Sequence, residues 1–179
     1  MKRVILLSIM LVLCFALSVR AQTWQFMATE AEITAVTGLT DFYDAELGTD
    51  GNGLFAVVCT NGGDKILLID PDGTSKVQLL ASQADLVAAV NAANSDHADV
   101  TVVTIQALDF NADGKIIVFS DGSDPEESVV MALEPTVPTT INVLSCAVGS
   151  GGTSPCEGGN GMVVNGNAVY LLVEAGYGA

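Results

Sequence analysis

Ala81-Ser82-Gln83-Ala84-Asp85-Leu86-Val87-Ala88-Ala89-Val90 repeats the pattern of Ala28-Thr29-Glu30-Ala31-Glu32-Ile33-Thr34-Ala35-Val36, which lies 53 residues earlier in the chain. Both stretches read alanine, hydroxyl, any residue, alanine, carboxylate, aliphatic, any residue, alanine, and both close on valine. Each is followed by an Asp-Gly turn and then by an apolar run typical of a β-strand. An internal repeat of this kind indicates a row of copies of one helix-plus-strands unit.

Each copy of the repeat opens with a predicted short helix. Thr29 in the first copy and Ser82 in the second suit the N-cap, and the carboxylates three residues later, Glu32 and Asp85, complete capping boxes. Gly38 is expected to end the first helix. The predicted helices are 29–36 and 82–93, the second with Leu86, Val87 and Val90 facing inward.

Short apolar runs separated by turns rich in Gly, Asn and Asp predict β-strands after each helix. The run 54–60 has almost no polar break, which is typical of a strand buried on both faces. The alternating run 76–80 predicts an outer edge strand. The expected strands are 42–47, 54–60, 65–69 and 76–80 in the first unit, and 104–110, 115–120, 128–133 and 140–144 in the second.

The spacing of the turns shows how closely the two units agree. Asp50 and Asp113 are 63 residues apart and Pro71 and Pro135 are 64 apart, whereas the two helices are only 53 apart. We therefore expect roughly ten residues, about 91–100, to be inserted as surface loop between the second helix and the strand after it.

The N-terminus has the features of a secretory signal peptide. Lys2 and Arg3 precede an uncharged apolar run over 4–19, and Val19-Arg20-Ala21 offers small residues where a signal peptidase cleaves. A transmembrane anchor is the alternative, but the run is shorter than the ~20 residues of a spanning helix. The sequence thus predicts a signal peptide over 1–21 and a mature domain over 22–179, located outside the cell, in the periplasm or at the cell surface.

Charge limits the partners of the mature chain. Residues 1–21 contain no acid, so their removal leaves three lysines against 21 acidic residues, a net charge of −18. Such a surface repels phosphate backbones and anionic lipids, so we expect neither nucleic acid nor, after signal cleavage, a membrane as partner. Half of the residues are hydrophobic, which predicts a folded chain and not a disordered one.

Three cysteines remain in the mature chain. Cys146 and Cys156 flank a short flexible loop, and in an exported protein a disulfide between them is the natural expectation. A metal site is the alternative, although it needs more ligands than the single histidine, His97, provides. Cys59 lies in an apolar run and is expected to be a buried, inert thiol.

Four short antiparallel strands, an Asp-Gly turn between the first two and the sequence Ile69-Asp70-Pro71-Asp72-Gly73-Thr74 after the third resemble a β-propeller blade. The segment 50–74 is similar to blades of the NHL-type and YVTN-type propellers of secreted bacterial proteins. The resemblance implies a mainly β fold, a propeller-like repeat of four-stranded antiparallel blades with short inter-blade helices. The helices depart from the simplest members of these families. Because such blades occur in enzymes, binders and scaffolds alike, the resemblance implies no particular activity.

The blades expected from this resemblance number about two and a half. They lie at about 42–80, 104–144 and 161–179, the last with strands 161–164 and 168–173 around the turn Asn165-Gly166-Asn167. A propeller closes with four to eight blades, and an open array leaves a sheet face and an edge in water. The chain is then a fragment of a larger propeller, a subunit that completes a ring with other copies, or a sandwich-like stack.

One acidic segment is a candidate metal site. Carboxylates and hydroxyls crowd into 121–127, and Asp121, Asp124, Glu126 and Glu127 supply oxygen ligands of the kind that Ca²⁺ takes. No twelve-residue EF-hand spacing is present, and Asp in a turn often serves the backbone alone, so a solvated turn is the alternative. Calcium is the one cofactor that the sequence suggests.

No catalytic residue is assigned. His97, flanked by Asp96 and Asp99, is the single candidate general base, but no nucleophile motif accompanies it and it falls in the expected insertion, where an exposed loop histidine is the simpler reading. The glycine-rich stretches 149–152 and 158–161 lack the lysine and the strand-to-helix setting of a phosphate-binding loop. They are expected to be flexible connectors that bind no cofactor.

Two classes of function remain open, with a third beside them. The first is an exported, non-catalytic propeller-type module for binding or scaffolding, with a protein or glycan partner, or with other blades or copies that complete the ring. The second is the N-terminal part of a propeller enzyme, lactonase-like or quinoprotein-like, that needs further blades. The third is a self-assembling surface protein. Metal analysis and thermal shifts with calcium separate the second from the first, and particle size separates the third.

Overall fold

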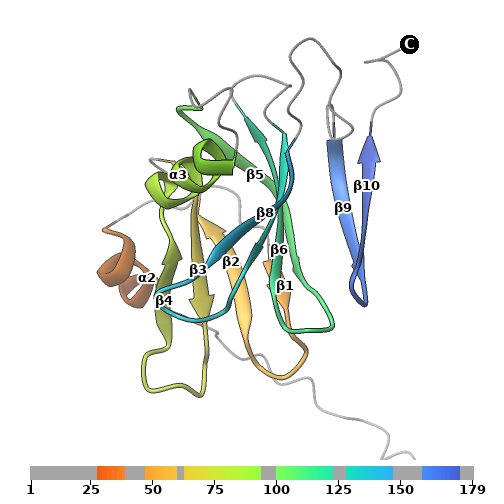
Figure 1. The fold of residues 1–179 in the computed structure, drawn as a ribbon. Coiled ribbons are helices and arrows are strands. Elements are labelled where there is room, and N and C mark those ends of the chain that lie inside the picture. The colour runs from red at the N-terminus through yellow and green to blue at the C-terminus, as the bar shows by residue number, and fades with distance from the viewer. Residues whose placement is uncertain are drawn as a thin grey trace, which may run out of the picture.

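A computed structural model of the chain describes residues 28–38, 47–59, 63–93, 100–122, 128–146 and 159–173. These residues form two four-stranded antiparallel sheets, a two-stranded antiparallel hairpin and two helices (Figure 1). The prediction of a mainly β chain made of small antiparallel sheets is confirmed.

The first sheet is a meander of four strands in chain order, β1 (Leu47–Thr49), β2 (Phe55–Cys59), β3 (Lys65–Ile69) and β4 (Val77–Ala81). As predicted, β2 is buried on both faces and β4 lies at the edge. The described strand Leu47–Thr49 extends two residues beyond the end of the predicted strand 42–47, and residues 39–46 lie outside the described part.

The second sheet repeats this meander with β5 (Val103–Phe110), β6 (Ile116–Gly122), β7 (Val129–Leu133) and β8 (Ile141–Cys146). The hairpin consists of β9 (Gly159–Asn165) and β10 (Ala168–Val173). Its two-residue turn places Gly166 at a φ of 62°, a left-handed conformation that glycine adopts without steric cost. The four strands of the second sheet and the two strands of the hairpin begin and end within two residues of their predicted positions.

The two helices form through the same capping box. Helix α2 (Glu30–Thr37) is capped by Thr29, and helix α3 (Gln83–Ala93) begins directly after Ser82. In each, the N-cap backbone N–H and hydroxyl both donate to the carboxylate three residues on, at 2.7 and 2.9 Å for Thr29 and at 2.8 and 2.6 Å for Ser82. Gly38 ends α2 in the left-handed conformation, as predicted.

The pairing registers show which residues of the two sheets correspond. Phe55 pairs with Ile69 at one end of the first sheet, and Ile116 pairs with Leu133 at the same end of the second sheet. Phe55 therefore corresponds to Ile116, which lies 61 residues later. The turn before each of these residues has the same offset, so Asp50 corresponds to Asn111. The sequence alignment of Asp50 with Asp113 was wrong, because it matched the Asp-Gly dipeptides instead of the residue that organises each turn.

That organising residue works in the same way in both turns. The Oδ1 atom of Asp50 accepts the backbone N–H of Asn52 at 2.8 Å and of Leu54 at 2.9 Å. The Oδ1 atom of Asn111 accepts the N–H groups of the equivalent residues, at 3.1 and 2.8 Å. A side-chain oxygen that accepts the backbone N–H two residues later is a standard turn device, and here it also accepts the N–H four residues later. Both Asp and Asn carry such an oxygen, which explains why they exchange here.

The corrected register relocates the insertions. With the helices 53 and the first turns 61 residues apart, the helix-to-strand connection of the second unit is eight residues longer, not about ten. The second sheet also has three extra residues between its middle strands, because 121–128 takes the place of 60–64. The expected surface loop 91–100 is partly structural: the side-chain amide of Asn91 forms hydrogen bonds with both backbone groups of the buried Val100, at 3.0 and 3.1 Å.

The two sheets stack with unlike faces in contact. The face of the second sheet that carries Val118 and Met131 packs on the face of the first sheet that carries Val58 and Leu68. By the corrected register, Val118 and Met131 correspond to Val57 and Leu67, which lie on the opposite face of the first sheet together with the apolar side of α2. The other face of the second sheet packs against the hairpin. The layers α2, first sheet, second sheet and hairpin therefore follow one another in one direction, each packing on the next.

The two sheets are closest at their first strands, β1 and β5, and farther apart at their last strands, β4 and β8 (the outer strands). At Gly48 in β1 a Cβ atom would lie 2.9 Å from the backbone of Asp109 in β5, so only glycine permits this approach. At the outer strands, α3 contacts β4 of the first sheet and β8 of the second (Figure 1). Its Leu86 and Val90 are fully buried in the core between the sheets. The helix therefore fills the wide side of a wedge.

Candidate functional site

A groove lies at the wide side of the wedge, between α3, β4 and the loop that connects β7 to β8. It has a volume of about 430 Å³, within the range of small-ligand sites. Most of its lining is apolar, with two polar side chains at the wall: Leu79, Leu80, Asp85, Ala88, Ala89, Val137, Pro138, Thr139 and Ile141.

The two polar groups of this groove are already engaged. The Asp85 carboxylate accepts from the hydroxyl and backbone N–H of Ser82, and these hydrogen bonds hold the pKa of Asp85 below its ordinary value. The Thr139 hydroxyl donates to the Glu134 carbonyl at 2.7 Å. A lowered pKa keeps Asp85 charged at neutral pH. The groove therefore offers apolar walls and a fixed negative charge, a setting for binding, with no nucleophile and base in contact.

A second polar cluster joins the two sheets. The buried Asp64, 6% exposed, precedes β3, and its Oδ2 atom accepts the backbone N–H of Ile105 in β5 at 2.5 Å. Beside it, Nε2 of Gln83 donates to the Val103 carbonyl at 3.0 Å. The Oε1 atom of Gln83 is buried and has no hydrogen-bond partner among the described residues. These groups connect the start of α3 and both sheets through side chain to backbone contacts.

Burial is the largest influence on the pKa of Asp64. Loss of solvent raises the pKa of its carboxyl, and the hydrogen bond from Ile105 and the charge of Lys65 act in the opposite direction without cancelling that effect. Elsewhere a raised pKa in a cleft marks a candidate acid or base. Here the carboxylate faces a backbone N–H of the neighbouring sheet, so its evident role is to hold the two sheets in register.

The predicted calcium ligands fall mostly outside the described residues. Asp121 lies near the end of β6, paired with Thr104 of β5, while Asp124, Glu126 and Glu127 are not among the residues that the structure describes. Within the described part, no group of three or more His, Cys, Asp or Glu side chains is placed to hold a metal ion. Calcium at 121–127 stays a prediction.

The cysteines and the histidine divide in the same way. Cys59 is a free thiol buried in β2, as predicted, and burial raises its pKa, which makes it less reactive. Cys146 is the last residue of β8, and Cys156 and His97 lie outside the described residues. The disulfide between Cys146 and Cys156 and the exposed position of His97 therefore stay predictions.

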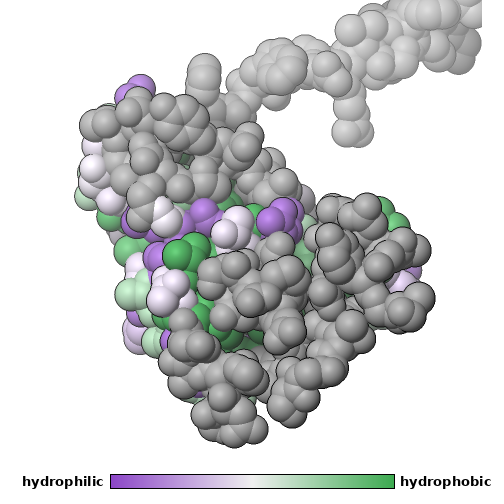
Figure 2. Space-filling model, turned by 90° about the horizontal axis from the view of Figure 1, so that it is seen from above, coloured by the Kyte–Doolittle hydropathy of each residue, from purple (hydrophilic) through white to green (hydrophobic). Residues whose placement is uncertain are grey.

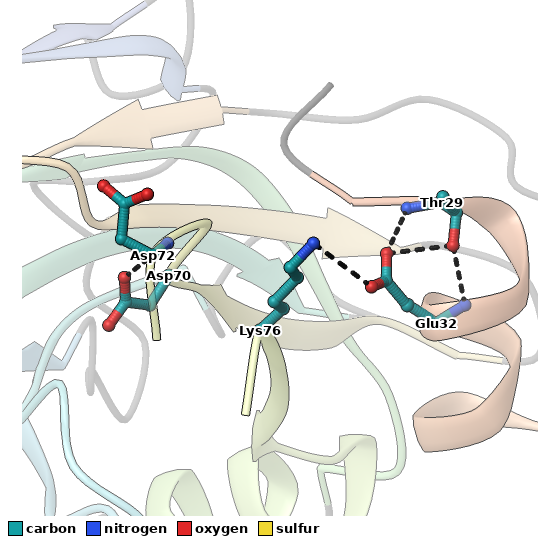
Figure 3. A network of polar contacts seen from close by, with 5 residues as sticks. All are labelled: Thr29, Glu32, Asp70, Asp72 and Lys76. Carbon is teal, nitrogen blue, oxygen red and sulfur yellow. Dashed lines mark hydrogen bonds and ion pairs between the residues drawn. The ribbon is translucent and has the colours of Figure 1, made fainter. Parts of the chain in front are cut away.

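Acidic side chains of the first unit form a small network (Figure 3). One oxygen of Glu32 accepts from Thr29 at the start of α2, and the other lies 3.7 Å from Nζ of Lys76. The cap hydrogen bonds of Thr29, more than the charge of Lys76, lower the pKa of Glu32. Asp70 accepts the N–H of Asp72 within its own turn. These carboxylates serve caps and turns.

No family model matches the chain, and neither curated proteins nor solved structures give a match. Among the described residues, no helix combines the length and apolar character needed to span a membrane.

Sequence reasoning missed both the groove and Asp64. On the face in Figure 2, hydrophobic and strongly polar residues lie side by side at the surface. The groove walls come from two segments, 79–89 and 137–141, which are far apart in the sequence and which no local pattern connects. Asp64 has one signal in the sequence: it is an acid that directly precedes a buried strand. Its counterpart in the second sheet, Ser128, is also buried.

Proposed function

We propose that the chain is an exported, non-catalytic module of the β-propeller type that serves binding or scaffolding. The observation that carries this proposal is the wedge. Two four-stranded meanders of equal register stack by unlike faces, touch at Gly48 and are held apart at their outer strands by α3. Contacts between unlike faces add units in one direction and generate rings or open arrays, whereas a two-fold sandwich brings like faces together.

The polar groups of the described residues support binding over catalysis. Glu32, Asp85 and Asp50 cap helices or turns, and Asp64 holds the sheets together. The groove beside α3 is a concave surface formed by described residues, and it is apolar with one fixed negative charge. A neutral or partly apolar ligand, such as a glycan face or a peptide, suits it better than an anion does.

The groove test uses two variants of the same helix. Ala88 lines the groove, and Ala84 is exposed on α3 but is not part of the lining. We expect the secreted chain to bind members of a glycan array or of a peptide array, Ala88→Trp to lose at least about tenfold in affinity, and Ala84→Trp to bind as the unmodified chain does. Equal binding by both variants, or no binding on either array, contradicts the groove as the ligand site.

Export is tested on the same preparation. Mass spectrometry of the secreted chain is expected to find Gln22 at the N-terminus, as cleavage after Ala21 requires. A chain that stays in the cytoplasm with residues 1–21 attached contradicts the exported location and leaves the groove experiment intact.

A further inference from the structure

The outer face of the hairpin is apolar and exposed within the part of the chain that the structure describes. Val163, Tyr170 and Leu172 are 64%, 59% and 69% exposed, and Tyr170 pairs directly with Val163 across the two strands. The alternate residues Val164 and Leu171 face the other way and pack against the second sheet. The outer residues, the open hairpin face, therefore form one contiguous apolar stripe.

Charge distinguishes this face from the rest of the molecule. The chain carries 27 charged residues and a formal net charge of −15, yet none of the fifteen residues 159–173 is charged. Between residues 135 and 173 the one charged residue is Glu157. Edge strands of natural proteins usually carry a charge or a proline that blocks pairing, and neither is present in β9 or β10.

We propose that the open hairpin face binds the same face of a second copy of this chain, forming a two-fold symmetric dimer. Two copies with this net charge repel each other through most of their surfaces, and contact at an uncharged face avoids that repulsion. A strongly charged partner, in contrast, finds no opposite charge to recognise on Val163, Tyr170 and Leu172.

The packing already present in the chain shows the geometry. The inner face of the hairpin lies on the outer face of the second sheet through Val164, Val169 and Leu171. Two hairpins that meet by their outer faces continue this sheet-on-sheet packing by one further layer, with aligned strands about 10 Å apart.

The opposite end of the stack selects a closed dimer over a filament. A head-to-tail array needs the hairpin of one copy to dock on the outer face of the first sheet of the next. That face is already buried, with Leu67 and Ile69 inaccessible. Helix α2 packs along it and carries the exposed Glu30. Like faces therefore meet, and a two-fold contact closes on itself.

The contact is small, because a two-stranded face falls short of the ~800 Å² per partner that a stable interface buries. We expect a reversible dimer with a dissociation constant of about 10–100 µM. Sedimentation velocity of the purified chain over about 1–300 µM measures it directly. The dimer stands apart from the proposed function, because the groove beside α3 is not part of the hairpin.

Two valines provide matched variants. Val163 lies on the open hairpin face, and Val137 is similarly exposed, at 52%, in the loop between β7 and β8. We expect Val163→Glu and Val163→Lys each to raise the dissociation constant at least about tenfold, because a charge of either sign resists burial. Val137→Glu and Val137→Lys, which add the same charges elsewhere, are expected to leave it unchanged.

Circular dichroism spectra and melting temperatures of the four variants show whether each is folded. A Val163 variant that melts early is replaced by Tyr170→Arg, which places a charge on the same face. A chain that stays monomeric up to about 300 µM overturns the proposal, as does mass that grows beyond two copies. Equal effects of the Val163 and Val137 substitutions also overturn it, because repulsion by net charge would then explain both. Loss of array binding by the groove variants with the dimer intact separates the failure of one proposal from that of the other.

Discussion

Leu80 and Leu144 occupy the same place in the two sheets and have opposite environments. Each is the residue that the ladder skips, at the bulge in the outer strand of its sheet. Leu80 is 5% exposed and belongs to the core between the sheets, whereas Leu144 is 56% exposed. Leu80 shares its core with α3, which directly follows β4, whereas the residues that directly follow β8 lie outside the described part.

The same contrast holds for the helices. Both have the same capping box, but α3 buries Leu86 and Val90 between two sheets, while α2 has no fully buried residue beside one sheet. The cap is a local device that works wherever its sequence occurs. Burial, in contrast, depends on the neighbouring unit. A unit of this repeat is therefore stabilised mainly by the next unit along the chain, as expected for arrays with contacts between neighbours only.

The largest expected effect comes from truncating the two leucines. Leu80→Ala removes a buried side chain and should lower the free energy of unfolding by about 2–5 kcal/mol. Leu144→Ala removes a mostly exposed one and should change it by less than about 0.5 kcal/mol. Urea denaturation at micromolar protein, below the expected dimer range, measures both. A cost for Leu144→Ala as large as that for Leu80→Ala would show that the side chain of Leu144 is buried in solution, in contrast to its exposure in the structure.

The second effect concerns Asp64, which contacts the neighbouring sheet through Ile105. Asp64→Ala leaves the buried N–H of Ile105 without its acceptor and should cost about 1–3 kcal/mol of unfolding free energy. Asp64→Asn keeps a side-chain oxygen and is expected to cost less at neutral pH, since it also removes a charge from a buried site. Urea denaturation of both variants at neutral pH gives this order, and equal costs would contradict the role of the acceptor oxygen.

The pH dependence of the same pair has a definite sign. Burial raises the pKa of Asp64 above its ordinary value of 3.8, so the folded state binds the proton more tightly than the unfolded state does. The contribution of Asp64 to stability therefore falls as pH rises from the ordinary pKa to the raised one. The pKa values of Glu32 and Asp85 are lowered, so their contributions to stability are lost as pH falls. Subtracting the Asp64→Asn profile from that of the unmodified chain cancels their shared contribution. A flat difference profile between about pH 3 and pH 7 would contradict the raised pKa.

The outcome for the fold shows how much structure a sequence carries by itself. The capping boxes and strand runs were readable because each depends on neighbours within a few residues, such as Thr29 with Glu32 or Asn165 with Ala168 across a two-residue turn. The register between units was misread by two residues because Asp-Gly dipeptides recur at different places in similar turns. The groove and the bond from Ile105 to Asp64 depend on packing between segments 41 or more residues apart, and no local pattern encodes them.

The smallest expected effect compares the two caps. Ser82→Ala removes the N-cap of a helix whose Leu86 and Val90 lie in the central core, so its loss should appear in global unfolding, at about 1 kcal/mol. Thr29→Ala removes the same hydrogen bonds from α2, which packs against one sheet alone. We expect it to change global stability by less than about 0.5 kcal/mol and to act by local fraying. Amide hydrogen exchange distinguishes the two: Ser82→Ala should speed exchange in α3 and both sheets together, and Thr29→Ala in α2 alone. Faster exchange throughout the first sheet in Thr29→Ala would mean that α2 stabilises the stack as strongly as α3 does.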